Sequence, residues 1–160
     1  MGLPTVSVRA SFLRGMSEFC AEDGTATAWL ENAATDFESF VADRRAVREL
    51  WEVPTTELWF VDETDYFGTV MIRHRLTPAL TEVGGHLGYH VVPSERRRGH
   101  ATAMVGQALG FCCELGLEEI IVTCAPENVG SRRAIEANGG TFEGIHGGEC
   151  RYMLSSDRGQ

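Results

Sequence analysis

One segment past the middle of the chain constrains its fold more than any other. A strand-like run ends at Val91-Val92-Pro93, a basic turn follows at Arg96-Arg97-Arg98, and a helical pattern begins at Gly99. The first backbone N–H groups of such a helix have no partner, and the helix dipole adds about half a positive charge. Gly99 and Ala101 leave these amides uncovered, so the junction can hold a diphosphate. The alternative is an ordinary helix start beside solvated arginines.

Two other phosphate-binding loops are excluded by spacing. A nucleotide P-loop requires G-x-x-x-x-G-K-[ST], and a dinucleotide-binding turn requires G-x-G-x-x-G early in a βαβ unit. Neither string follows a predicted strand here, because the junction has the single glycine Gly99. The segment therefore predicts a diphosphate site of another kind.

The hydrophobic pattern predicts a mixed α/β chain of the α+β class. We expect one mixed, mostly antiparallel sheet with helices on both faces. Residues 1–160 contain no repeat or linker, and their length suits a single domain. The predicted strands are 4–9, 57–62, 66–75, 84–92, 118–124, 141–145 and 149–154. The predicted helices are 10–20, 36–50, 99–115 and 128–138. We expect a loop at residues 23–28 and a turn at 76–82.

Composition limits the partners and the compartment. The net charge of −9 argues against nucleic acid, which requires a basic face. No apolar run approaches the roughly 18 residues that span a bilayer, and the first residues lack a secretory pattern. The five cysteines are an odd number without a C-x-x-C pair, which is typical of buried thiols in a reducing cytosol. We therefore expect a cytoplasmic protein without a membrane partner, in which Cys150 is the one candidate nucleophile.

The junction and a second element together resemble a known family. Arg96-x-x-Gly99-x-Ala101 after a strand is similar to the pyrophosphate loop of the GNAT superfamily of N-acetyltransferases. The strand at 118–124 is followed by Asn128-x-x-Ser131, which is the family's second motif. The resemblance covers roughly residues 57–154. It is closest to bacterial predicted acetyltransferases with the strings RHRL, GGHLGY, NxxSRxxIExNGG and RY, which stand here at 73–76, 84–89, 128–140 and 151–152.

The resemblance implies an N-acetyltransferase that uses acetyl-coenzyme A as co-substrate and a small-molecule or peptide amine as acceptor. The sheet would be splayed at the cofactor site, and a homodimer is compatible with the family. The alternative is a non-catalytic acyl-coenzyme A binding or sensing module. The implied cofactor-binding residues are the backbone of Val91, Val92 and Pro93 for the pantetheine arm, the N–H groups of Arg97, Arg98, Gly99, His100, Ala101 and Thr102 for the pyrophosphate, and Asn128 and Ser131 beside the pantetheine.

The catalytic residues are less clear, because Ile135 stands where the superfamily often has a tyrosine proton donor. Histidine is suited to proton transfer near neutral pH, so His86 on the strand before the junction is our first candidate, and Tyr152 on the last strand is our second. His90 shares a face with His86, and Tyr89 points to the other face; both are further candidates. For each of these residues a structural hydrogen bond is the alternative. We expect no metal site, because the histidines do not have ligand spacing.

Two arginines on the predicted strand 66–75 are unusual in an apolar segment. Arg73 and Arg75 share a face and could bind a carboxylate of the acceptor. Alternatively, they pair with Glu82 or Asp62 within the protein. The sequence leaves these two interpretations open.

Overall fold

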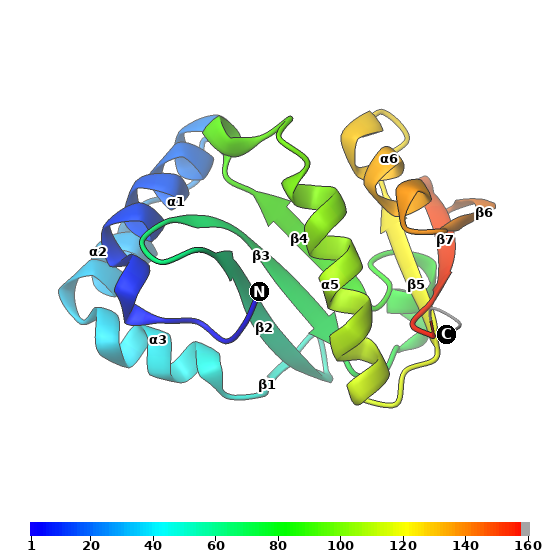
Figure 1. Ribbon diagram of the computed structural model, residues 1–160, viewed down its shortest axis with the longest axis horizontal. Helices are drawn as coiled ribbons and strands as arrows, with labels where there is room; N and C mark the ends of the chain where they lie inside the picture. The colour runs from blue at the N-terminus through cyan, green and yellow to red at the C-terminus, as the bar shows by residue number, and fades with distance from the viewer. Residues whose placement is uncertain (158–160) are drawn as a thin grey trace.

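The computed structural model describes residues 1–157, which form two neighbouring antiparallel sheets (Figure 1). The first sheet has the order β1-β2-β3-β4 and the second has the order β5-β7-β6. Their strands are β1 (Arg48–Leu50), β2 (Val53–Val61), β3 (Tyr66–Arg73), β4 (Leu87–Val91), β5 (Glu119–Cys124), β6 (Thr141–His146) and β7 (Glu149–Ser155).

Helices cover both faces of the sheets, which confirms the predicted α+β class. Three helices gather at one side of the first sheet, and two lie beside the line where the sheets meet (Figure 1). The first group is α1 (Arg9–Asp23), α2 (Ala28–Thr35) and α3 (Phe37–Arg45), and the second is α5 (His100–Glu114) and α6 (Val129–Ala137). Short pieces complete the chain: α4 (Pro78–Glu82), η1 (Val6–Val8) and η2 (Pro93–Glu95). No helix among residues 1–157 is long and apolar enough to cross a bilayer.

Each face of the first sheet has its own core. Val70 and Ile72 of β3 point toward α5 and join the larger cluster, which continues into the second sheet. Trp59 of β2 points the other way and stacks on Phe12 of α1, with ring centroids 4.5 Å apart. This division follows from the strand period of two, which sends successive side chains to opposite faces.

The two sheets touch at one end of β4 and separate toward the other. Gly85 forms an isolated bridge with Val122, and the backbone N–H of His86 donates to the carbonyl of Ile121 at 2.7 Å. A Cβ at Gly85 would lie 2.3 Å from that carbonyl oxygen, and its φ is 63°, so only glycine fits this junction. Beyond His86 no pairing joins β4 to β5 among the described residues. The gap between the two sheets therefore corresponds to the splayed sheet that the family resemblance implies at the cofactor site.

Two sequence predictions for the N-terminal third are wrong. Residues 4–9 are not a strand: Thr5 accepts a hydrogen bond from the N–H of Ser7 and starts η1, and only Gly2 pairs with β2, opposite Trp59. The helix predicted at 36–50 ends at Arg45, and its last residues form β1. The turn after β1 explains the change, because Trp51 and Glu52 both have positive φ, as a tight hairpin with the twist of its strands requires.

Smaller differences concern helices that the sequence did not indicate. The turn expected at 76–82 contains α4, which Thr77 caps by accepting from the N–H of Leu80. Helix α2 follows the predicted loop and was not foreseen. The other predicted strands and helices agree with the structure to within a few residues.

Candidate active site

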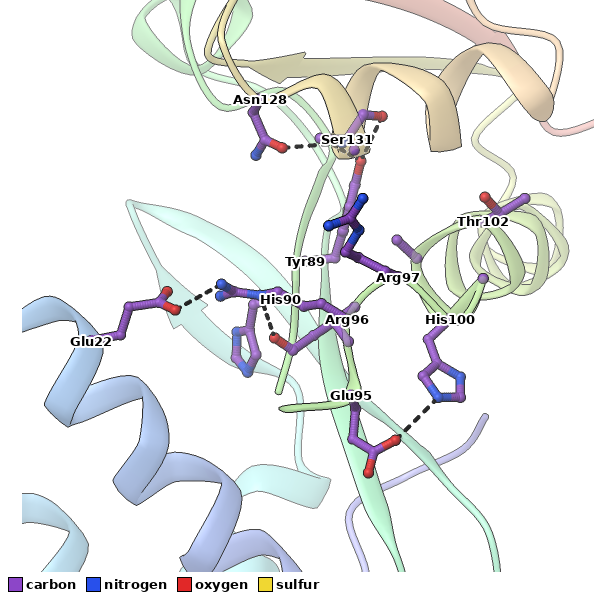
Figure 2. A pocket seen from close by; sticks show the side chains of 14 residues that line it. Glu22, Tyr89, His90, Glu95, Arg96, Arg97, His100, Thr102, Asn128 and Ser131 are labelled. Atoms are coloured by element: carbon purple, nitrogen blue, oxygen red, sulfur yellow. Dashed lines mark hydrogen bonds and ion pairs between the residues drawn. The ribbon is translucent and has the colours of Figure 1, made fainter. Parts of the chain in front are cut away.

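A cavity of about 610 Å³ lies where the two sheets separate. Its walls come from the outer half of β4, the turn after it, the start of α5, the start of α6 and one residue of α1 (Figure 2). The lining residues are Glu22, Tyr89, His90, Val91, Glu95, Arg96, Arg97, Gly99, His100, Ala101, Thr102, Asn128, Gly130 and Ser131.

The N-terminus of α5 faces this cavity with free backbone donors. Gly99 is the N-cap residue with φ 82°, and no side chain caps the helix. The first intrahelical bond runs from the N–H of Ala103 to Gly99, and the N–H groups of residues 97–102 have no partner within residues 1–157. Arg97 also has a positive φ, 64°, which turns neighbouring amides toward one concavity. This arrangement fits the diphosphate site that the sequence predicts.

Most of the predicted cofactor-binding residues lie together, but three lie outside the lining. The N–H of Val92 donates to the carbonyl of Phe67 and its own carbonyl accepts from Glu95, so its backbone is already paired. Pro93 has no N–H and begins η2. The Arg98 side chain turns outward to Glu95, with a 3.1 Å contact between Nη1 and Oε2.

The edge of β4 offers other backbone groups in their place. In an antiparallel pair, alternate residues bond to the partner strand and those between them point away. The N–H of Arg73 donates to the carbonyl of His86 and the N–H of Val92 donates to that of Phe67, so the even-numbered residues of β4 bond to β3. The backbone groups of Tyr89 and Val91 therefore face the gap. If this alternation had been applied to the sequence, Tyr89 and not Val92 would have been predicted to bind the pantetheine arm through its backbone.

The start of α6 forms the opposite wall. The Asn128 side chain caps the helix, with its Oδ1 accepting from the N–H of Ser131 at 3.1 Å. The Oγ of Ser131 lies 2.5 Å from the hydroxyl of Tyr89, so a hydrogen bond crosses the gap from β4 to α6 (Figure 2). Both predicted residues of this motif line the cavity.

Tyr89 is the tyrosine that lines the cavity, whereas Ile135 stands where the superfamily often has a tyrosine. Ile135 is fully buried in the core one turn after Ser131 and carries no polar group. The Tyr89 hydroxyl reaches the first turn of α6 from the other wall. Burial raises the pKa of Tyr89 to about 12, so its proton is retained at neutral pH.

His90 stands on the opposite face of β4, toward α1. Its ring packs edge-on against Phe19, with centroids 4.7 Å apart, and its Nε2 lies 3.0 Å from the hydroxyl of Tyr66. That hydroxyl lies 2.6 Å from the Oγ1 of Thr69, while Nδ1 of His90 has no hydrogen-bond partner within residues 1–157. Burial, with a smaller effect of Arg96, lowers the pKa of His90 to about 4, so the imidazole is neutral at pH 7.

The first two catalytic candidates lie outside the cavity lining. His86 sits at the closed end of the gap, where its Nδ1 accepts from the N–H of Ile121 at 3.0 Å. Tyr152 is fully buried, donates to Glu136 at 2.7 Å and accepts from Nε of Arg132 at 3.1 Å. Both residues therefore have the structural hydrogen bonds that were the alternative reading. Cys150 is also buried, opposite Cys124 in the second sheet.

Three lining residues, Glu22, Glu95 and Gly130, were given no role by the sequence analysis. Glu22, near the end of α1, forms a 2.8 Å ion pair with Arg96 and so ties the helix to the turn after β4 (Figure 2). The two residues are far apart in the chain, and nothing in the local pattern of α1 marks Glu22. The pair closes the cavity on the α1 side.

Comparisons with known proteins agree with this geometry. Residues 9–141 match the family model described as acetyltransferase (GNAT) domain. Among solved structures, Mycobacterium smegmatis RimJ in complex with CoA-disulfide is 19% identical, with a TM-score of 0.64 over 95% of this chain and 79% of that one. The microcin C7 self-immunity acetyltransferase MccE, in complex with acetyl-CoA and AMP, is 15% identical, with a TM-score of 0.63 over 95% of this chain and 89% of its own.

RimL, a ribosomal L7/L12 alpha-N-protein acetyltransferase in complex with coenzyme A, has the same fold. It is 11% identical, with a TM-score of 0.64 over 96% of this chain and 92% of its own. No curated protein sequence matches the chain.

Proposed function

The chain belongs to the GNAT family of acetyltransferases, and on this premise we propose that it is an N-acetyltransferase that uses acetyl-coenzyme A and acetylates a primary amine. The observation that carries the proposal is the set of free amides at residues 97–102, which face a cavity bounded by the open edge of β4. Acetyl-coenzyme A supplies the acetyl group as a thioester. The proteins whose structures resemble this one support the same class of reaction, since MccE and RimL are named acetyltransferases with a coenzyme bound and RimJ is in complex with CoA-disulfide.

The residues for binding the coenzyme come from both walls of the gap. The amides of residues 97–102 fit a pyrophosphate, and each charge-assisted hydrogen bond there contributes roughly 1.5–3 kcal/mol. The backbone groups of Tyr89, the N–H of Val91 and the free amide nitrogen of Asn128 suit the pantetheine arm, while the carbonyl of Val91 already accepts from Nε of Arg96 at 3.3 Å. No side chain blocks the approach to these amides at Gly99, where an added Cβ would meet no other atom within 4 Å.

Attack on the thioester needs a neutral amine, and an α-amine with pKa 7.7–8.0 is neutral about one time in six to eleven at pH 7, whereas a lysine-like amine is neutral about one time in 2500. With a pKa of about 4, His90 takes a proton poorly from a free ammonium, but it can accept the proton that the nitrogen loses once that nitrogen has attacked the thioester and become acidic. If Nε2–H of His90 donates to Tyr66, and Tyr66 donates to Thr69, the unpaired Nδ1 carries the lone pair that takes the proton. Tyr66 is then a positioning residue.

Tyr89 is suited to the leaving thiolate on the other side of the strand. Its phenol stays protonated at neutral pH and lies at the α6 wall, so it can donate a proton or a hydrogen bond to sulfur. Successive residues of a strand point to opposite faces. Tyr89 and His90 thus flank one edge of β4, as acid on the coenzyme side and base on the acceptor side.

Calorimetry with coenzyme A and a thiol-release assay with acetyl-CoA and a panel of amines test this function. We expect binding in the micromolar range and release of thiol that depends on an amine. Replacement of Gly99 by tryptophan should abolish binding, because the indole would occupy the entry to the amides. Binding without turnover across the panel would favour the non-catalytic acyl-coenzyme A sensor, and retained binding by Gly99→Trp would reject the assigned junction.

A further inference from the structure

Arg73, at the end of β3, is a buried cation without a counter-charge. The residue is 8% exposed, and no carboxylate lies within ion-pair distance of it in residues 1–157. Its Nη1 donates to the carbonyls of Gly84 at 3.1 Å and Gly85 at 2.8 Å, while Nε is buried without a partner. The pairing with Glu82 or Asp62 that the sequence allowed is therefore not formed.

An uncompensated buried charge is costly, so its position calls for an explanation. Burial alone lowers the pKa of Arg73, with no acidic neighbour to oppose the effect. Two carbonyl dipoles satisfy Nη1, but Nη2 has no hydrogen-bond partner among the described residues. Removing a charge from water costs several kcal/mol unless an opposite charge or a full set of hydrogen bonds replaces the water. Nε is thus a buried donor that lacks an acceptor, and Nη2 is an unpaired donor that solvent or a ligand can reach.

The surroundings of Arg73 put this donor on the acceptor face of β4. A Cβ at Gly88 would lie 3.4 Å from Nη2, so the guanidinium rests over the glycine, and the Trp51 ring lies 4.3 Å from its Cζ on the other side. Gly88 and His90 point to the same face of the strand, two residues or about 7 Å apart. The three central residues of β4, Gly88, Tyr89 and His90, are only partly buried.

We propose that Arg73 binds a carboxylate of the acceptor, about 7 Å from the amine that reacts beside His90. The acceptor is then an amine that carries a negative charge, either a small amino acid derivative or a peptide with an acidic residue near its N-terminus, rather than a polyamine. The chain itself has a net charge of −9, so such an acceptor needs a local cation to bind against the general repulsion. This inference rests on the proposed acetyltransferase function and names the substrate class of that site.

Matched pairs of acceptors test the proposal with the full chain. Glycylglycine and glycylglycinamide differ only by a terminal carboxylate, and the amidated tripeptides Gly-Asp-Ala and Gly-Asn-Ala differ only by a side-chain carboxylate. We expect kcat/KM to be at least about 10-fold higher for the acidic member of one pair, the effect of one charge-assisted hydrogen bond. The first pair identifies a small amino acid derivative, and the second identifies a peptide.

Variants assign any preference to Arg73. In Arg73→Met the ratio within the pair should fall to about one, and Arg75→Met is the control, since Arg75 is exposed and its Nη2 only donates to the carbonyl of Glu52. Gly88→Val is the second variant: its Cβ would lie in ordinary contact with Nη2 at 3.4 Å and its two methyl groups would cover the guanidinium, so it should also reduce the ratio if Arg73→Met fails to fold.

Two results overturn the proposal. One is an equal kcat/KM for both members of both pairs, and the other is an acidic preference that persists in Arg73→Met or Gly88→Val. Turnover of glycylglycinamide without an acidic preference rejects this inference alone. If the protein neither binds the coenzyme nor turns over any acceptor, both the proposed acetyltransferase function and the inference about Arg73 are rejected.

Discussion

The two sides of β4 are built in different ways. On the coenzyme side the donors are backbone amides of one continuous segment, residues 97–102, and they need only an open loop and two left-handed residues, Arg97 and Gly99. On the acceptor side His90 depends on Phe19 and Tyr66, side chains from two distant segments. A site made of backbone tolerates changes of side chain around it, whereas a site made of packed side chains changes with any of them. The coenzyme side therefore suits a shared reactant and the acceptor side a particular one.

The largest effect should come from a charge placed on the coenzyme side. We expect Gly99→Asp to weaken coenzyme A binding by about 1000-fold, because a carboxylate about 4 Å from a phosphate is opposed by about 4 kcal/mol at a protein surface. Thermal stability should fall only slightly, because the left-handed backbone at Gly99 costs a residue with a Cβ about 1–2 kcal/mol and a negative charge at a helix N-terminus offsets part of this cost. Calorimetry and thermal melting measure the two effects. Gly116→Asp is the control, since Gly116 has a φ of 75° and equally open space beyond the other end of α5. Binding within 10-fold of the parent would contradict the comparison.

The next effect belongs to the acceptor side. His90→Gln should lower kcat about 100-fold, the usual loss for a general base, with the dissociation constant of coenzyme A little changed. Steady-state kinetics and calorimetry on one preparation measure both quantities. His146→Gln is the matched control, because His146 lies on β6 and contacts only the carbonyl of Glu143 at 3.2 Å. A kcat within threefold of the parent for His90→Gln would remove His90 from the chemistry.

The same histidine should make stability depend on pH. Its pKa is lowered from 6.5 to about 4 in the folded chain. Between these values the unfolded chain binds a proton that the folded chain does not, so the free energy of unfolding falls as pH falls through this window. The loss should be about 2–3 kcal/mol and absent in His90→Gln. Urea unfolding of both proteins at pH 7 and 4.5 tests this, and identical pH dependence would show that His90 is not desolvated.

Tyr89 is the side chain of β4 on the coenzyme side, and its loss should be milder. Tyr89→Phe is expected to lower kcat about 10-fold, since a thiol with a pKa near 8.5 departs without full proton transfer. Ser131→Ala removes the same 2.5 Å contact but keeps the phenol, so a smaller loss of kcat separates proton donation from positioning. Unchanged kcat in Tyr89→Phe would exclude the phenol as the acid.

The smallest effect concerns the cap of α6. Asn128→Asp keeps the oxygen that accepts from Ser131 but loses the amide donor, so coenzyme affinity should fall by up to about 10-fold while the free energy of unfolding is kept. Asn128→Ala loses the cap as well and should cost about 1 kcal/mol of stability. Chemical denaturation and calorimetry measure the pair. Equal stability of the two variants would mean that the cap contributes nothing.

Local patterns predicted the fold better than they predicted the catalytic groups. The junction at Gly99 and the cap at Asn128 were recognisable because each depends on neighbours within a few residues. That His90 lines the cavity and His86 does not, which is the basis for our proposal of His90 as the base, could not be foreseen in this way. Both histidines share a face of the same strand, and only the bridge from Gly85 to Val122 decides which end of that strand is closed. The helix predicted through residue 50 failed for the same reason, because pairing with β2 outweighed the local pattern.

By itself the sequence determined the α+β class, the open helix start at Gly99 that we propose as the diphosphate site, and the family resemblance, because these follow from periodicity, from the steric freedom of Gly99 and from short motifs. The tertiary structure alone decided that Tyr89 and His90 face the cavity, that His86 and Tyr152 are occupied elsewhere, and that Arg73 is buried without a carboxylate. The physical reason is that proton transfer and charge recognition depend on burial and on distances of a few ångströms between segments far apart in the chain.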